Sequence, residues 1–288
     1  MNLYITTNIP EMRSIISFNR ISNNISEIVR RLETGERIIA AKDDPVGLIM
    51  RETMRADITG IKAAQKTTSA ANEFLSTAES GLANISRLLI GDINNRDDNG
   101  LIGLIYDDTL PADMRQQQIN DILNLIDGTA RATNYNGKRM LDGSMSHEGA
   151  LFQLGKDVQD SMQYRMEMPN MTTTNLGGAS GKLYELREID LDTDAGKALA
   201  YSIVNEAVTM VARQRGIIGS VQKNILDNNA RNLDIQLEKI SEAEGLISNV
   251  DMAWESSQLN RAELLAQSAM SAILYSQNFA SYIANLLA

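Results

Sequence analysis

Two groups of side chains in this sequence could support chemistry. The adjacent acids Asp43 and Asp44 could form a metal-binding or acid–base pair, and the single histidine, His147, could act as a general base. Pro45 follows the acids directly and no histidine is near them in the sequence, a pattern typical of a turn that caps a helix. We interpret Asp43 and Asp44 as that cap, and we predict no catalytic residue, no metal site and no cofactor.

Composition excludes several other classes of function. The 288 residues include no cysteine, so no disulfide, cysteine-based zinc site or thiol nucleophile can form. We find neither a nucleophile elbow nor a phosphate-binding glycine motif. A formal net charge of -10 disfavours nucleic-acid binding. No apolar stretch of about 18 residues predicts a membrane span, and the N-terminus lacks the basic and apolar parts of a cleaved signal peptide.

Helical spacing dominates the first third of the chain. Ile21, Ile25, Ile28 and Leu32 form one helical stripe. A longer helix follows the turn, because apolar or small residues recur at intervals of seven without a slip, at Met54, Ile61, Thr68, Leu75, Leu82 and Leu89. Alanines fill most of the positions between them. This heptad repeat predicts coiled-coil packing against a second long helix.

The last third returns to the same pattern. We expect a helix from about residue 194 to 250, in which four apolar residues lie seven apart, at Leu226, Leu233, Ile240 and Ile247. A final helix should run from about 256 to 287. Between the two helical parts, alternating apolar and polar residues around 162–168 indicate a strand, with 151–155 as its partner. Residues 169–182 read as a flexible connection within a short linking region at about 144–193.

These patterns predict a mainly α fold. We expect a long antiparallel coiled-coil rod with a small β-hairpin region, in which the N- and C-terminal helices pair. A compact helical bundle without end-to-end pairing is the alternative that periodicity leaves open.

Several short segments resemble one known family. The segment Arg31-Leu-Glu-Thr-Gly-Glu-Arg37, with 41–48 after it, is similar to the N-terminal signature of bacterial flagellins. Residues 136–143 and 152–155 resemble the turn and strand that follow in that family. Residues 215–222, 247–253 and 264–267 resemble its C-terminal half. The resemblance covers nearly the whole chain, in order.

The resemblance implies a structural subunit, not an enzyme, that polymerises into the flagellar filament for motility. It implies an inner domain made of residues 1–42 plus 252–288, a coiled coil ordered on assembly, and a rod domain over 43–251 without a large outer insertion. Lys42, Asp43 and Asp44 would be the family-signature turn. The implied partners are other copies of the chain, hook-associated junction and cap proteins, and an export chaperone on the C-terminal helices. The implied location is the extracellular filament, reached through the flagellar type III apparatus.

Two sets of apolar residues should hold such a polymer together. The filament core interface is expected at Ile5, Ile21, Ile25, Ile28, Leu32, Leu259, Ala266, Ile273, Ile283 and Leu287. The rod seam is expected at Met54, Ile61, Leu75, Leu82, Leu89, Leu226, Leu233, Ile240 and Ile247. A hook–filament junction protein of the same superfamily is the alternative function. A secreted enzyme built on Asp44 and His147, or a coiled-coil adapter, is a more distant one.

Overall fold

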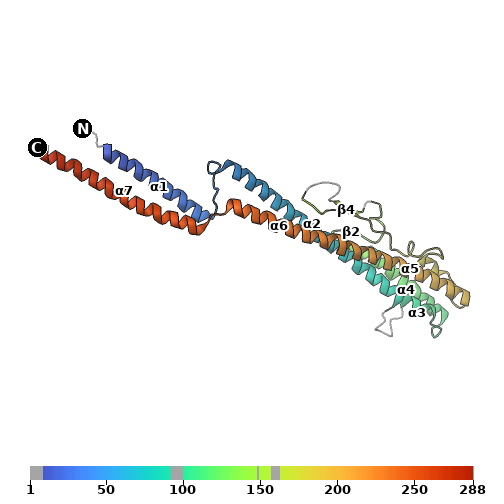
Figure 1. The fold of residues 1–288 in the computed structure, drawn as a ribbon. Helices are drawn as coiled ribbons and strands as arrows, with labels where there is room; N and C mark the ends of the chain where they lie inside the picture. Colours follow the sequence, from blue (N-terminus) through green and yellow to red (C-terminus); the bar gives the residue numbers. More distant parts are fainter. Residues whose placement is uncertain (1–8, 92–99, 148, 157–162, 288) are drawn as a thin grey trace. The chain divides into compact units, whose positions relative to one another are not determined.

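A computed structural model describes residues 9–91, 100–147, 149–156 and 163–287, except for the side chains of Pro10 and of residues 279–287. Its α-helices are α1 (Ile9–Thr34), α2 (Pro45–Ile90), α3 (Gly100–Ile105), α4 (Ala112–Ala132), α5 (Asp194–Val221), α6 (Asp227–Ser248) and α7 (Met252–Leu287) (Figure 1). Two antiparallel hairpins pair β1 (Asn134–Tyr135) with β2 (Lys138–Arg139) and β3 (Ala150–Gln153) with β4 (Gln163–Met166). The predicted mainly α class is therefore confirmed.

The chain forms two compact units. The terminal unit contains residues 1–58 and 238–288, and the central unit contains residues 59–237. Both α2 and α6 contribute residues to each unit.

In the terminal unit, α1 and α7 lie side by side and run antiparallel (Figure 1). Gln277 of α7 donates to Glu11 near the start of α1, and Arg31 near the end of α1 pairs with Glu255. On each helix, one series of buried and half-buried positions recurs at steps of three and four residues, which is coiled-coil spacing. The series comprises residues 11, 14, 18, 21, 25, 28 and 32 of α1 and 255, 259, 262, 266, 269, 273 and 276 of α7, and residues 27, 29, 30, 31 and 258 beside it are also half-buried.

The two segments that link the helices of the terminal unit pair with each other. Glu36 forms an antiparallel β-bridge with Asn249. The Arg37 amide donates to the Ser248 carbonyl at 2.6 Å, and the Val250 amide donates to the Gly35 carbonyl at 3.0 Å. These bonds use backbone groups that the ends of α1 and α6 would otherwise leave unpaired.

The central unit is built on the heptad positions of α2. Ile61, Ala64, Thr68, Ala71, Leu75, Ala78, Leu82, Ile85 and Leu89 are all buried. Polar pairs show that α2 runs antiparallel to the α5–α6 segment: Glu79 accepts from Arg215, Asn72 from Gln222, and Thr68 from Asn229. The predicted helix over 194–250 ends at Ser248, and a π-helical turn, η3 (Gln222–Leu226), interrupts it.

One local expectation was wrong. Residues 169–182 are an ordered segment packed on the central core, not a flexible connection. Met171 and Leu176 are fully buried, and the Asp127 carboxylate accepts bonds from the amide and hydroxyl of Thr173. The segment lacks helical or strand periodicity, so its burial left no pattern in the sequence.

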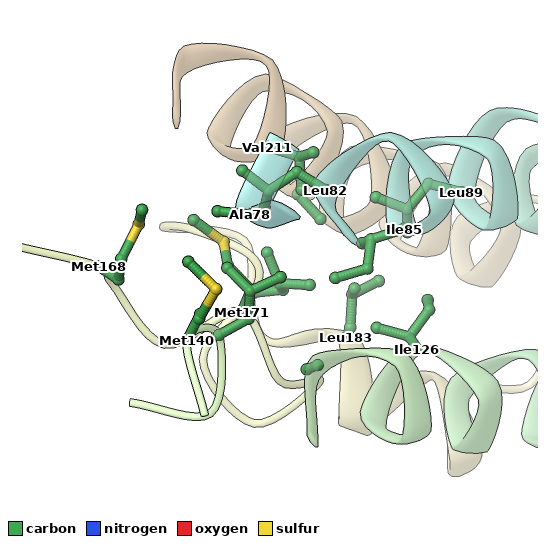
Figure 2. Close-up of a cluster of buried hydrophobic side chains, with 14 of the residues drawn as sticks. Ala78, Leu82, Ile85, Leu89, Ile126, Met140, Met168, Met171, Leu183 and Val211 are labelled. Atoms are coloured by element: carbon green, nitrogen blue, oxygen red, sulfur yellow. The ribbon is translucent and has the colours of Figure 1, made fainter. Parts of the chain in front are cut away.

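Methionines line the core where this segment and the hairpins meet the helices. Met140, Met168 and Met171 are fully buried and belong to the same hydrophobic cluster as Ala78 and Leu82 (Figure 2). Because the unbranched methionine side chain fits irregular gaps, it suits a surface between turns and helices. The 3₁₀ helix η2 (Leu183–Arg187) closes the same core with Leu183 and Leu186.

Candidate functional site: the paired terminal helices and the turn before α2

The turn before α2 uses its acidic side chains for backbone capping. Asp43 Oδ2 accepts from the amides of Ile39 (3.1 Å) and Ala40 (2.9 Å), and Asp44 Oδ1 accepts from the Gly47 amide at 2.9 Å. The bond from the Ala40 amide is the main reason that the pKa of Asp43 lies below its usual value. The two carboxylates therefore act as caps of the turn and of α2.

Lys42, the remaining member of the signature turn, is exposed and pairs with Glu27 of α1 at 2.8 Å. The turn is thus bonded to α1 as well as to α2. Gly47 completes it, because a Cβ atom there would lie 2.4 Å from Asp44 Oδ2 and 2.7 Å from Ile38 Cδ1.

A second network of charged side chains connects the same turn to the neighbouring helices. The side chain of Arg51 is nearly buried and donates to the Ile38 carbonyl at 2.5 Å and to Glu36 at 3.0 Å. Arg55 bridges Glu36 (2.7 Å) and Glu244 of α6 (3.0 Å). The hydrogen bond from Arg55 is the main cause that lowers the pKa of Glu36. These bonds connect α2, α6 and the segment after α1.

The residues predicted as filament core interface lie mostly in the seam between α1 and α7. Ile28 is buried, whereas Ile21, Ile25, Leu32, Leu259, Ala266 and Ile273 are half-buried. Ile5 lies outside the described residues, as do the side chains of Ile283 and Leu287. Their contact with other subunits stays a prediction.

Apolar residues that the helical stripe did not single out lie on the outer faces of this pair. They are Ile9, Met12, Ile15 and Ile16 of α1 and Met252, Trp254, Leu264, Leu265, Met270, Leu274 and Tyr275 of α7. Leu264 is 64% exposed and Tyr275 is 79% exposed. Since soluble monomers seldom expose many large apolar side chains together, this set indicates surfaces that another chain covers. We call it the outer apolar set. The sequence indicates this set only through apolar residues at helix positions outside the heptad stripe.

The residues predicted as the rod seam lie on the inward faces of their helices. Ile61, Leu75, Leu82, Leu89, Leu226 and Leu233 are buried, and Met54, Ile240 and Ile247 are half-buried. Polar bonds flank the seam of the central unit, among them the pair of Gln65 with Asp234 at 2.6 Å.

Within the described residues, the histidine and the possible metal ligands are the remaining candidates for chemistry. His147 is exposed and lies in a turn. Across the described residues, no three side chains from His, Cys, Asp and Glu are grouped as metal ligands would be. Within the same residues, none of the helices has the length and apolarity that crossing a membrane requires.

Comparison with known proteins gives consistent results along the whole chain. The family described as bacterial flagellin N-terminal helical region matches residues 5–146, and the flagellin C-terminal helical region matches 201–287. The chain is 29% identical to a flagellin of Bacillus subtilis over 276 residues, covering 88% of this chain and 90% of that protein. It is 28% identical to the flagellar filament 30.7 kDa core protein of Treponema maltophilum, covering 90% of each chain.

A solved structure shares the fold. The match is a putative flagellar hook-associated protein from Vibrio parahaemolyticus, with a TM-score of 0.55 and 15% identity. It covers 72% of this chain and 99% of that one. At this identity the likeness concerns the fold alone.

Proposed function

Because the chain belongs to the bacterial flagellin family and is a structural subunit of the flagellar filament, we propose that the outer apolar set of α1 and α7 forms its contacts with neighbouring subunits. The observation that supports this proposal is exposure. The α1–α7 seam buries one face of each helix and leaves large apolar side chains on the others. Burying them against further copies would provide the hydrophobic driving force for polymerisation.

The proposal assigns the two ends of the chain to one filament domain. Residues 1–42 and 252–288 would form the inner domain, and residues 43–251 the rod domain. The antiparallel α1–α7 pair supports the inner domain, since it joins the first and last helices. The seam residues Ile28 and Ile273 would position the pair, while the outer faces contact other subunits.

Further partners follow from membership of the family. We propose that the copies of this chain at the two ends of the filament contact hook-associated junction and cap proteins. We also propose that a chaperone binds the C-terminal helix before export by the flagellar type III apparatus. The exposed apolar side chains of α7 support a chaperone site, because they would favour aggregation if left uncovered in the cell. A structural role without catalysis agrees with the use of Asp43 and Asp44 as backbone caps at the turn before α2.

The test replaces exposed apolar residues while leaving the seam intact. The double variant Leu264→Gln/Tyr275→Gln should fold as a monomer with an unchanged circular dichroism spectrum but fail to form filaments in electron micrographs. Ser271→Gln is the matched control, because it places the same side chain at an exposed position of α7 without removing an apolar group. Filaments of normal length and number from the double variant would refute the proposed contact surface.

A truncation tests the larger assignment. Deletion of residues 264–288 removes most of the outer apolar set of α7 and should leave a soluble monomer that cannot polymerise. Sedimentation and negative-stain microscopy would separate the two states. Filaments of ordinary morphology from the truncated chain would contradict the inner-domain assignment itself.

A further inference from the structure

The buried positions of α5 and of α6 follow two different heptad phases. Val204, Val211 and Ile218 are buried and lie seven residues apart. Leu226 and Leu233 are also buried and seven apart, but Ile218 and Leu226 are separated by eight residues. One extra residue therefore stands between the two halves of this helical segment.

The opposing helix has no such interruption. From Ile61 to Leu89 one series of buried positions of α2 alternates at steps of three and four throughout, with Phe74 and Gly81 buried beside it. An α-helix with one extra residue would turn its apolar face about 100° away from its partner, since 3.6 residues make a full turn. The α5–α6 segment must absorb that residue locally to keep both halves on α2.

The π turn η3 lies at this point. The Asp227 amide donates to the Gln222 carbonyl, a bond over five residues in place of the usual four, so the turn holds one more residue. Side chains on each side fasten it: Gln222 donates to Asn72 (3.0 Å) and Ser76 (3.1 Å) of α2, and Asn228 donates to the Asn224 carbonyl at 2.9 Å.

We infer that residues 216–226 form a phase-correcting joint in which the π turn absorbs the extra residue. In this joint the backbone hydrogen bonds of the helix break transiently, while the apolar contacts with α2 on either side stay formed. Two glycines precede the turn, Gly216 and Gly219. A Cβ atom would meet nothing within 4 Å at either position, so packing does not require glycine there. Glycine weakens a helix relative to alanine, which lowers the local stability of α5 in the turn before the π segment.

The decisive experiment deletes one residue inside the joint. Deletion of Lys223, which is exposed, would place Leu226 four residues after Val221 and restore an unbroken heptad pattern. We expect this variant to fold with a melting temperature equal to or above that of the full chain. Deletion of Arg213 is the matched control, because it removes another exposed basic residue from the same helical segment but moves Gln214 and Ile218 out of phase with Val211. That variant should melt at a clearly lower temperature.

Hydrogen exchange of the full-length monomer tests the local opening. Amides of 222–227 should exchange at least about tenfold faster than those of 203–214 in the natural sequence, and this difference should disappear after deletion of Lys223. Gly216→Ala and Gly219→Ala should each slow exchange at the joint about fourfold, from the helix propensity of alanine over glycine. Equal melting temperatures for the two deletions, or equal protection of both segments in the natural sequence, would overturn the inference.

Discussion

The ion pair at the base of the α1–α7 seam leads to a prediction of unequal costs. Arg31 Nη1 lies 3.2 Å from Glu255 Oε1, and the two side chains differ in exposure: 30% for the arginine and 2% for the glutamate. Replacing Arg31 by methionine leaves a buried carboxylate without its cation. Replacing Glu255 by methionine leaves a guanidinium group that can still reach water along its flexible stem.

The magnitudes follow from this asymmetry. Removing one partner of a buried pair typically costs 3–5 kcal/mol, and the partial exposure of Arg31 places Arg31→Met near the lower end, at about 3 kcal/mol. Glu255→Met should cost only about 1 kcal/mol, because the remaining charge stays hydrated. Glu255 occupies a seam position next to Leu259 and Ala262, so methionine also adds apolar contact there. The double variant should be close to Glu255→Met, which gives a coupling energy of roughly 2–3 kcal/mol.

The chain supplies its own probe for this measurement. Trp254 is the single tryptophan and precedes Glu255 at the start of α7. Urea unfolding of the monomer followed by Trp254 fluorescence would report on the terminal unit, and circular dichroism would report on all helices. The four proteins of the double-mutant cycle should be compared at one pH and one salt concentration.

Either of two results would refute the reasoning. The first is a cost of Glu255→Met equal to or above that of Arg31→Met, which would mean that exposure does not decide the penalty. The second is a coupling energy near zero, which would mean that the pair is not formed in solution.

Two further predictions concern the central unit and the junction. Gly81→Ala should destabilise the chain by about 1–3 kcal/mol, because its Cβ would lie 2.4 Å from the Thr133 hydroxyl, whereas Gly128→Ala, with nothing within 4 Å, should stabilise it by up to about 1 kcal/mol. Urea midpoints of the two variants would check this, and a stable Gly81→Ala protein would contradict it. Because the bond from Arg55 holds the pKa of Glu36 below its ordinary value of 4.5, its contribution to stability is complete above about pH 4.5 and is lost as the pH falls through the folded value. The natural chain should therefore lose more stability between pH 5 and 3 than Glu36→Gln; parallel losses would argue against this role.

Much of the helical architecture can be predicted from the sequence because its buried residues follow a seven-residue repeat. The seven-residue spacing from Ile61 to Leu89 fixed which face of α2 is buried, and Pro45 after two acids indicated the cap that Asp44 forms. The spacing from Leu226 to Ile247 predicts a seam on α6 whose phase differs from that of the buried residues of α5. The extra residue is therefore visible in the sequence, but only when the two spacings are compared.

Other features had no periodic signal. The buried segment 169–182 packs through turns, and Arg51 and Arg115 each find partners outside their own helices, at Glu36 and at Asp192. Arg115 is nearly buried and pairs with Asp108 at 3.2 Å and with Asp192. Spacing along one helix cannot predict such pairs, because they depend on which loops meet in three dimensions.

Burial differs between the two units in a way that separates folding from assembly. Among the described side chains of α1 and α7, only Ile28, Glu255 and Ala262 are buried, whereas the central unit has a continuous core of fully buried residues. Since apolar burial is the main source of stability, the central unit can fold without help from other chains, and the terminal pair is the weaker part of the monomer. Contacts that bind only the folded pair would stabilise it by mass action. We therefore expect polymerisation and ordering of the terminal helices to be coupled, with the apolar faces that are unfavourable in the monomer providing the driving force for the polymer.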